Sequence, residues 1–181
     1  MFKRGCREEI DTRRFRAKLM LVMALLKELK LRVENNAEVV RRSRARLLER
    51  ARVIRERFGE SYAARLFKEA RSYEVVEAHL RYVSALLERL LIRLETLVVA
   101  GSIFEAAALA SQVVRELKRS LVYKMPQFGV VVDEVDRASR ELVEVSRSAG
   151  YAPSKSVVSE EAKRILREAE ALVASQEMEN R

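Results

Sequence analysis

Few residues in this chain have a type and spacing that could support catalytic chemistry. There is one histidine, His79, and one cysteine, Cys6, whereas the usual zinc sites need three or four such ligands close together. The five glycines are scattered and form no phosphate-binding loop followed by Lys-Ser or Lys-Thr. Glu141 and Glu144 fit a solvated helix face, since no apolar pocket is evident around them. We therefore expect a protein that is not an enzyme and uses no metal or cofactor.

Charge is a more informative feature than catalytic residue types. The first 58 residues hold 18 lysines and arginines against 8 acids, a net charge of +10, and the rest of the chain carries a net charge of −1. A basic segment of this kind favours an anionic partner, either nucleic acid or acidic lipid. The basic run 41–58 is explained equally well as an anion-binding face or as a solvated helix face, because Glu49 and Glu56 interleave with its arginines.

A membrane-binding set can be chosen from the start of the chain. No interleaved aromatic residues accompany the charges, which disfavours single-stranded nucleic acid, whereas lipid headgroups need only charge. No apolar run approaches the roughly 18 residues that span a bilayer, so membrane contact would be peripheral. The predicted membrane-binding residues are Phe2, Lys3, Arg4, Arg13, Arg14, Arg16 and Lys18.

All the elements that must position these residues are predicted to be helices. Apolar residues recur every three or four positions through residues 15–58, where only Arg44 breaks the row, and again through 66–97 with Val76 in the row. Gly59 can end the first helix before the second begins. Two helices of about 40 to 48 residues, about 60 to 70 Å long, can bury such narrow stripes only side by side. The fold class is therefore all-α, with a long antiparallel hairpin followed by shorter helices.

The later part of the chain is divided by two predicted hinges, Gly101 and Pro126. Pro126 removes a backbone donor and restricts Met125, so the preceding helix should end there. A segment rich in serine, glycine and proline then predicts a linker, and Ser159 resembles a helix N-cap. The expected organisation is a leader at 1–9, a helical core at 10–148, a linker at 149–158 and a C-terminal helix at 159–181.

One long stretch resembles a known family. The segment LERLLIRLETLVVAGSIFEAAALASQVVRELKRSLVYKMPQFGVVVDEVDRASRELVEV, residues 87–145, is similar to the part of ESCRT-III proteins in which helix two ends, helix three follows and a Met-Pro precedes helix four. The resemblance covers about residues 10–148 and is strongest to the archaeal cell-division (Cdv) B group. The 32 residues after Ala149 are too few for the winged-helix region of fuller members, and their proline-rich ATPase-docking segment is absent.

The resemblance implies a filament-forming subunit that remodels membrane during cell division or scission. It would be cytoplasmic and peripheral on the inner face of the cell membrane at the division site. Its partners would be copies of itself, paralogous ESCRT-III-like subunits and an anionic membrane surface. An AAA-family ATPase is a further implied partner, although the final helix is only loosely similar to the family's docking motif. A basic nucleic-acid-binding module and a coiled-coil adaptor stay open as alternatives, with nucleic acid the less favoured partner.

The family also implies a change between a closed form, with later helices folded back on the hairpin, and an open form that polymerises. Gly101 and Pro126 would be the hinges of that change. The predicted fourth helix carries acids that could lie near the basic hairpin in one form or meet a neighbouring subunit in the other. These predicted assembly residues are Asp133, Glu134, Asp136, Glu141 and Glu144.

Overall fold

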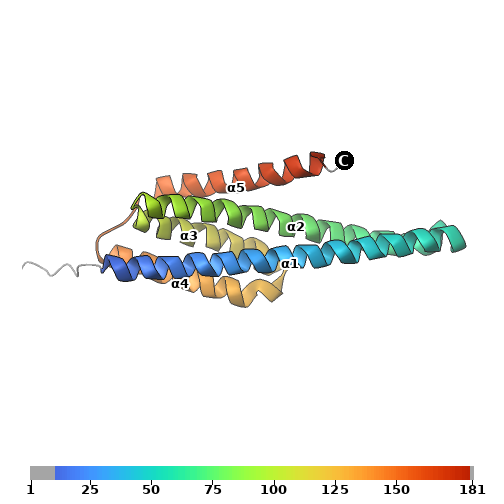
Figure 1. Ribbon diagram of the computed structural model, residues 1–181, viewed down its shortest axis with the longest axis horizontal. Coiled ribbons are helices and arrows are strands. Elements are labelled where there is room, and N and C mark those ends of the chain that lie inside the picture. Colours follow the sequence, from blue (N-terminus) through green and yellow to red (C-terminus); the bar gives the residue numbers. More distant parts are fainter. Residues whose placement is uncertain (1–10, 180–181) are drawn as a thin grey trace, which may run out of the picture. The chain divides into compact units, whose positions relative to one another are not determined.

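The computed structural model describes residues 11–179, and throughout that range the regular elements are helices (Figure 1). The all-α prediction, with two long helices followed by shorter ones, is confirmed. The leader and three predicted membrane-binding residues, Phe2, Lys3 and Arg4, lie outside the described residues. The elements are α1 (Thr12–Phe58), α2 (Glu60–Val99), α3 (Ile103–Leu117), the π-helical turn η1 (Lys118–Val122), the 3-10 turn η2 (Pro126–Phe128), α4 (Gly129–Ser148) and α5 (Lys155–Glu179).

The chain divides into two compact units. One, which we call the core unit, comprises residues 11–29 and 86–168 of the described chain. The other, the turn unit, comprises residues 30–85 and the described end of α5 from 169. Helices α1, α2 and α5 each contribute residues to both units, whereas α3 and α4 belong to the core unit alone.

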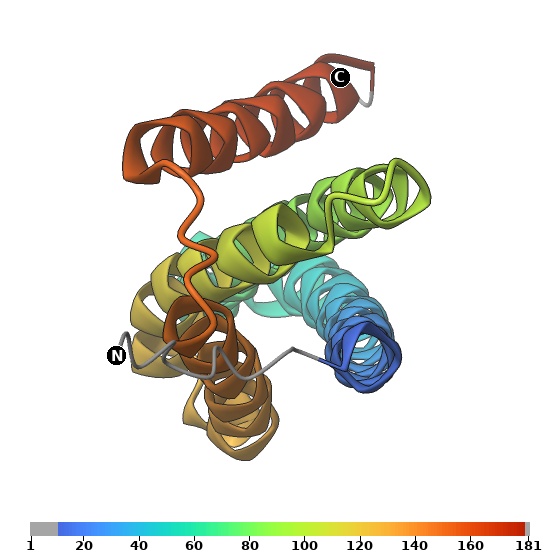
Figure 2. The same ribbon diagram turned by 90° about the vertical axis from the view of Figure 1, so that its left-hand side faces the viewer.

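The core unit is held together by apolar stripes from five helices, α1 to α5. Within it α3 and α4 lie side by side (Figures 1 and 2). Ala106, Ala107 and Ala110 of α3 are fully buried, and their small side chains let α4 approach closely. Full burial of each large side chain contributes about 1.5–3 kcal/mol. Those of α1 and α2 in this unit include Leu19, Leu26, Leu29, Leu86, Leu87, Leu90 and Leu94.

The turn unit has a narrower and partly polar seam between α1 and α2. Its buried residues include three alanines, Ala51, Ala63 and Ala70. The predicted stripe is wrong at Val76, which is 37% exposed, because α2 buries Glu77 instead at 3% exposure. Both positions fit a spacing of three and four residues between Tyr73 and Leu80, and a sequence pattern favours the apolar one. The prediction that Phe58 ends the buried stripe of α1 is also wrong, since its side chain is 63% exposed.

A charged layer explains why Glu77 lies in the seam. Arg44, the single polar interruption in the predicted stripe of α1, donates from Nη1 to Oε2 of Glu77 at 3.0 Å and from Nη2 to Glu74 at 3.4 Å. Arg81 makes a further ion pair with Glu77 from the same helix. A carboxylate removed from water needs such partners, so Arg44 selects Glu77 over Val76 as its neighbour.

Glycines end both long helices. Gly59 has a φ of +92° and donates its N–H to the carbonyl of Arg55 at 3.0 Å, and α2 begins at the next residue. Gly101 has a φ of +81°, while Ser102 donates to the carbonyl of Leu97 at 2.8 Å. This left-handed conformation is strained for any residue with a Cβ. The predicted helix ends at these two glycines are therefore explained by backbone geometry.

The chain stops being helical at Met125 and resumes at Pro126, as predicted. Pro126 occupies the first position of η2, where its missing N–H is not required. The C-terminal helix, in contrast, begins at Lys155 rather than at the predicted Ser159. Val158 starts the buried stripe of α5, and its N–H donates to the carbonyl of Ser154 at 3.1 Å. Burial of Val158 therefore favours helix within the serine-rich stretch, and the coil is limited to 149–154.

Candidate functional site

An open groove in the core unit brings together basic residues of α1 and acidic residues of α4. Arg14 and Lys18 lie one helical turn apart on α1, and Glu141 and Glu144 lie on α4. All four side chains are exposed. The groove thus contains two predicted membrane-binding residues and two predicted assembly residues. We call it the charged groove, and its lining is Asp11, Arg14, Phe15, Lys18, Glu141, Leu142, Glu144, Val145, Ser148 and Ala149.

The floor and one end of the charged groove are fixed by local structure. Phe15 of α1 and Leu142 of α4 are buried and form the floor of the groove. Oδ1 of Asp11 accepts hydrogen bonds from the backbone N–H groups of Arg13 at 3.0 Å and Arg14 at 3.2 Å. This N-cap satisfies donors that the first turn of α1 leaves free. The basic side chains therefore project from an ordered helix start.

No ion pair crosses the charged groove between its basic and acidic sides, within residues 11–179. The opposite charges face each other through solvent, where an interaction of two exposed charges is worth about 0 to 1 kcal/mol. Such an arrangement favours the observed position of α4 without fixing it. An anionic surface could therefore compete with Glu141 and Glu144 for the same basic side chains.

The remaining basic residues at the start of α1 differ in their contacts. Arg13 is exposed. Arg16 is also exposed, but its Nη2 donates to the carbonyl of Val98 at 3.4 Å, near the end of α2. A cation at a helix C-terminus is favoured by the helix dipole. The four described members of the predicted membrane-binding set thus remain solvent-accessible, with Arg16 partly engaged.

Two predicted assembly residues are part of an ionic cluster where α3 passes into α4. Nζ of Lys118, in the π-helical turn, lies 2.7 Å from Oδ1 of Asp133 and 3.3 Å from Oδ2 of Asp136. Arg140 binds Asp136 as well, at 2.9 Å. The hydrogen bonds that Lys118 donates to Asp133 and to Asp136 raise its pKa above the ordinary value. We call these four residues the elbow cluster.

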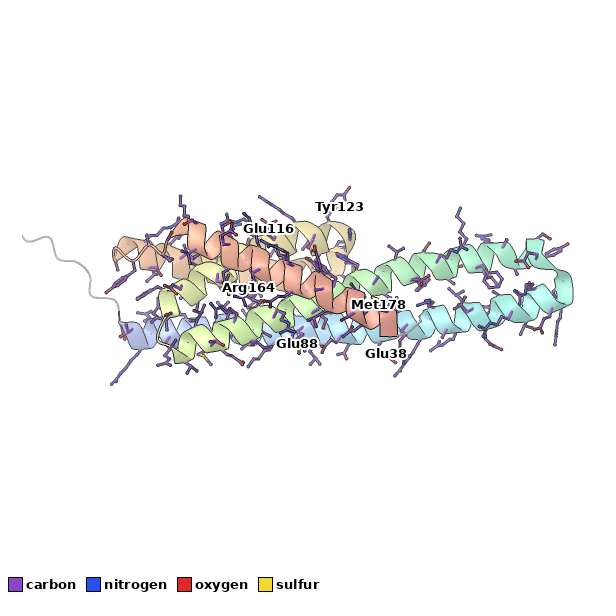
Figure 3. The ribbon with its side chains drawn as sticks, turned by 90° about the horizontal axis from the view of Figure 1, so that it is seen from above. Glu38, Glu88, Glu116, Tyr123, Arg164 and Met178 are labelled. Atoms are coloured by element: carbon purple, nitrogen blue, oxygen red, sulfur yellow. The ribbon has the colours of Figure 1, made fainter. Side chains whose placement is uncertain are left out.

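The elbow cluster includes a residue that the sequence did not indicate, Lys118. Asp136, one of the predicted assembly residues, is 3% exposed, and its part in assembly stays a prediction. Glu134 is exposed, as an assembly surface would require. Lys118 was missed because the π-helical turn changes the direction of side chains after Leu117. Tyr123, just beyond this turn, points away from the unit (Figure 3).

Both predicted hinge residues lie between elements of the core unit. Gly101 separates α2 from α3, and a Cβ at this position would meet no atom within 4 Å. Pro126 separates η1 from α4 and is exposed. Their role as hinges stays a prediction.

Residues 11–179 contain no group of three or more histidine, cysteine, aspartate or glutamate side chains placed to hold a metal ion. None of the described helices combines the length and apolar character needed to cross a bilayer.

Fold and site together define an all-α protein with a long helical hairpin, in which the basic start of α1 faces an acidic α4 across an open groove. The chain is 31% identical over 144 residues to a protein named Cell division protein B1 from Sulfolobus acidocaldarius, a match that covers 75% of this chain and 67% of that relative. No family model matches the chain, and neither does any solved structure. The chain belongs to the archaeal cell-division (Cdv) B group of the ESCRT-III family, as its sequence predicted.

Proposed function

We propose that the protein is a non-enzymatic subunit of a filament that assembles on a membrane and remodels it during cell division. Family membership supports the assignment to cell division, since the relative is named a cell division protein. The single observation that carries the membrane part is the charged groove. There Arg14 and Lys18 of α1 are exposed and lie across from Glu141 and Glu144 without direct pairing.

The first step of the proposed function is attraction of α1 to anionic lipid. Arg13, Arg14, Arg16 and Lys18 are all exposed, and each basic residue near an anionic surface contributes about 1 kcal/mol. The net charge of +10 on the first 58 residues adds a longer-range attraction. Contact is peripheral and takes place on the inner face of the cell membrane at the division site.

The second step is assembly with neighbouring subunits. When lipid headgroups occupy Arg14 and Lys18, Glu141 and Glu144 lose their basic counterpart and become available to a neighbour. Two packings of one chain that differ by only a few kcal/mol can be exchanged by such local charge changes. The neighbours are copies of this chain and paralogous ESCRT-III-like subunits, and an AAA-family ATPase is a further partner in remodelling.

A vesicle experiment tests the membrane step. The full-length protein and an Arg13→Glu/Arg14→Glu/Arg16→Glu variant are sedimented with anionic and with neutral vesicles. Three reversals at about 1 kcal/mol each predict a loss of affinity of roughly a hundredfold for anionic vesicles. Salt should weaken wild-type binding through screening, and helicity measured by circular dichroism should not change.

The matched control variant reverses three basic residues of α5, all of which are exposed: Lys163, Arg164 and Arg167. It has the same net charge as the test variant, so a local site predicts that it keeps most of its affinity. Equal sedimentation of both variants and the wild type would contradict the assignment to α1. A salt-titrated DNA shift with the same proteins separates a membrane subunit from a basic nucleic-acid-binding module, and negative-stain images with and without vesicles report the filament.

A further inference from the structure

A second groove in the core unit, with cations at its rim, has no role in the proposed membrane contact. It lies between α3, the end of α4, the coil 149–154 and the start of α5, and its volume is about 630 Å³, which lies within the range of ligand-binding pockets. Ala108, Val143 and Val158 contribute its apolar lining. Phe104 and Tyr151 are also part of the lining, with stacked rings whose centroids are 4.3 Å apart.

The rim of this groove is positively charged. Arg115 of α3, Arg147 of α4 and Lys155 of α5 line it, and the described lining includes no acid. We call it the basic groove. Three cations from three helices around a hollow produce a positive potential that attracts an acidic partner.

Nearby acids do not neutralise these cations. Among the described residues, no ion pair involves Arg115, Arg147 or Lys155. Glu161 at the start of α5 binds Arg93 at 2.6 Å, and Glu116 of α3 binds Arg119 at 3.3 Å. The positive charge of the basic groove is therefore available to an occupant from outside the unit.

An exposed ridge of α4, which borders the charged groove at Glu141 and Val145, has the chemistry that complements the basic groove. Val130 is 80% exposed, and Val145 is also exposed. Between them Glu134 and Glu141 are exposed on the same side of the helix, since the four positions are separated by four, seven and four residues. This ridge offers apolar ends and central acids to a groove with an apolar lining and a cationic rim.

We propose that the basic groove of one copy receives this exposed ridge of α4 from a second copy of this chain. This inference rests on the proposed filament and identifies the surface that α4 meets on its neighbour. Groove and ridge are different surfaces, so the contact is head-to-tail. A bound pair leaves one groove and one ridge free, and a contact of this kind extends into a filament unless it closes into a ring.

A charge-swap experiment tests the pairing. One full-length variant carries Arg115→Glu/Arg147→Glu and the other Glu134→Lys/Glu141→Lys, and assembly is followed by light scattering and negative-stain imaging on anionic vesicles. Each variant alone should need a protein concentration about tenfold higher than the wild type, because its groove and ridge then repel each other. An equimolar mixture should assemble within about twofold of the wild-type concentration, since each groove then meets a ridge of opposite charge.

The outcomes separate this inference from the proposed function. If the wild type does not assemble, the proposed filament fails and the inference fails with it. If the wild type assembles while both variants alone match it, or while their mixture does not recover, the groove-and-ridge contact is overturned and the filament stands. Circular dichroism melting of each variant guards against misfolding, and an Arg115→Ala/Arg147→Ala variant should show a smaller loss than the charge reversal.

Discussion

Replacing Arg44 by leucine should destabilise the hairpin, although it makes the apolar row of α1 continuous. The change leaves the carboxylate of Glu77, which is 3% exposed, with Arg81 as its remaining hydrogen-bonded cation. Removing one partner of a buried ion pair costs about 3–5 kcal/mol. Because one cation remains and the side chain of Arg44 is itself 31% exposed, we expect a loss of about 2 kcal/mol. For a chain of this length that corresponds to a fall in melting temperature of about 4–8 °C.

The companion variants make this test specific to the charged layer. Glu77→Leu should cost less than about 1 kcal/mol, because the freed arginines can reach water. The double variant Arg44→Leu/Glu77→Leu should be within about 1 kcal/mol of the wild type or more stable, since an apolar pair can replace a buried ion pair. Thermal and urea unfolding followed by circular dichroism measure all four proteins. The reasoning is refuted if Arg44→Leu melts like the wild type, or if the double variant is less stable than Arg44→Leu alone.

Two further perturbations test the core unit. Leu90→Asp places a charge at a fully buried position of α2 and should lower the free energy of unfolding by several kcal/mol. The control Ile92→Asp, at a half-exposed position, should cost less than about 1 kcal/mol. Equal melting temperatures of the two variants would show that the buried stripe of α2 is misassigned. Lys118 has a raised pKa in the folded state, so its contribution to stability is complete below the unfolded value of about 10.4 and is lost as pH rises through the folded value. Lys118→Met should therefore be less stable at neutral pH and show a weaker decline above about pH 10.4, and parallel pH profiles of variant and wild type would contradict this.

The spacing of apolar residues and the positions of glycine and proline were enough to predict the helices. The stripe of α1 from Phe15 to Val33 is buried as predicted, because a three-and-four spacing over many turns has few alternatives. Gly59 and Pro126 mark helix boundaries for backbone reasons that hold in any context. These features depend on the residue types of neighbouring positions, so they can be predicted from the sequence alone.

Several of the wrong or missing predictions depend on residues far away in the chain. Val76 and Glu77 fit the stripe of α2 equally well by spacing, and the choice is made by Arg44, 33 residues earlier. Asp136 is buried because Lys118 reaches it, and a π-helical turn has no simple signature in residue types. The earlier start of α5 follows from burial of Val158, which overrides the preference of serine-rich sequence for coil.

The charged groove was partly predictable. The basic character of α1 and the acidic residues of α4 were evident from the sequence, and the resemblance implied that the fourth helix could fold back on the hairpin. Which acids face α1 depends on the rotation of α4, and that rotation is set by the burial of Val135, Ser139, Leu142 and Ser146. Glu141 and Glu144 consequently face Arg14 and Lys18, while Asp136 turns inward.

The turn at Gly59 limits how the hairpin can change in evolution. Since one residue separates α1 from α2, the turn is too short to compensate for a change in the length of either helix. Inserting one residue between Arg44 and Gly59 would rotate the charge of Arg44 by about 100° away from Glu77 and shift it by about 1.5 Å. Insertions in this hairpin are tolerable only when both helices lengthen together, so natural length variation should collect in the coil 149–154.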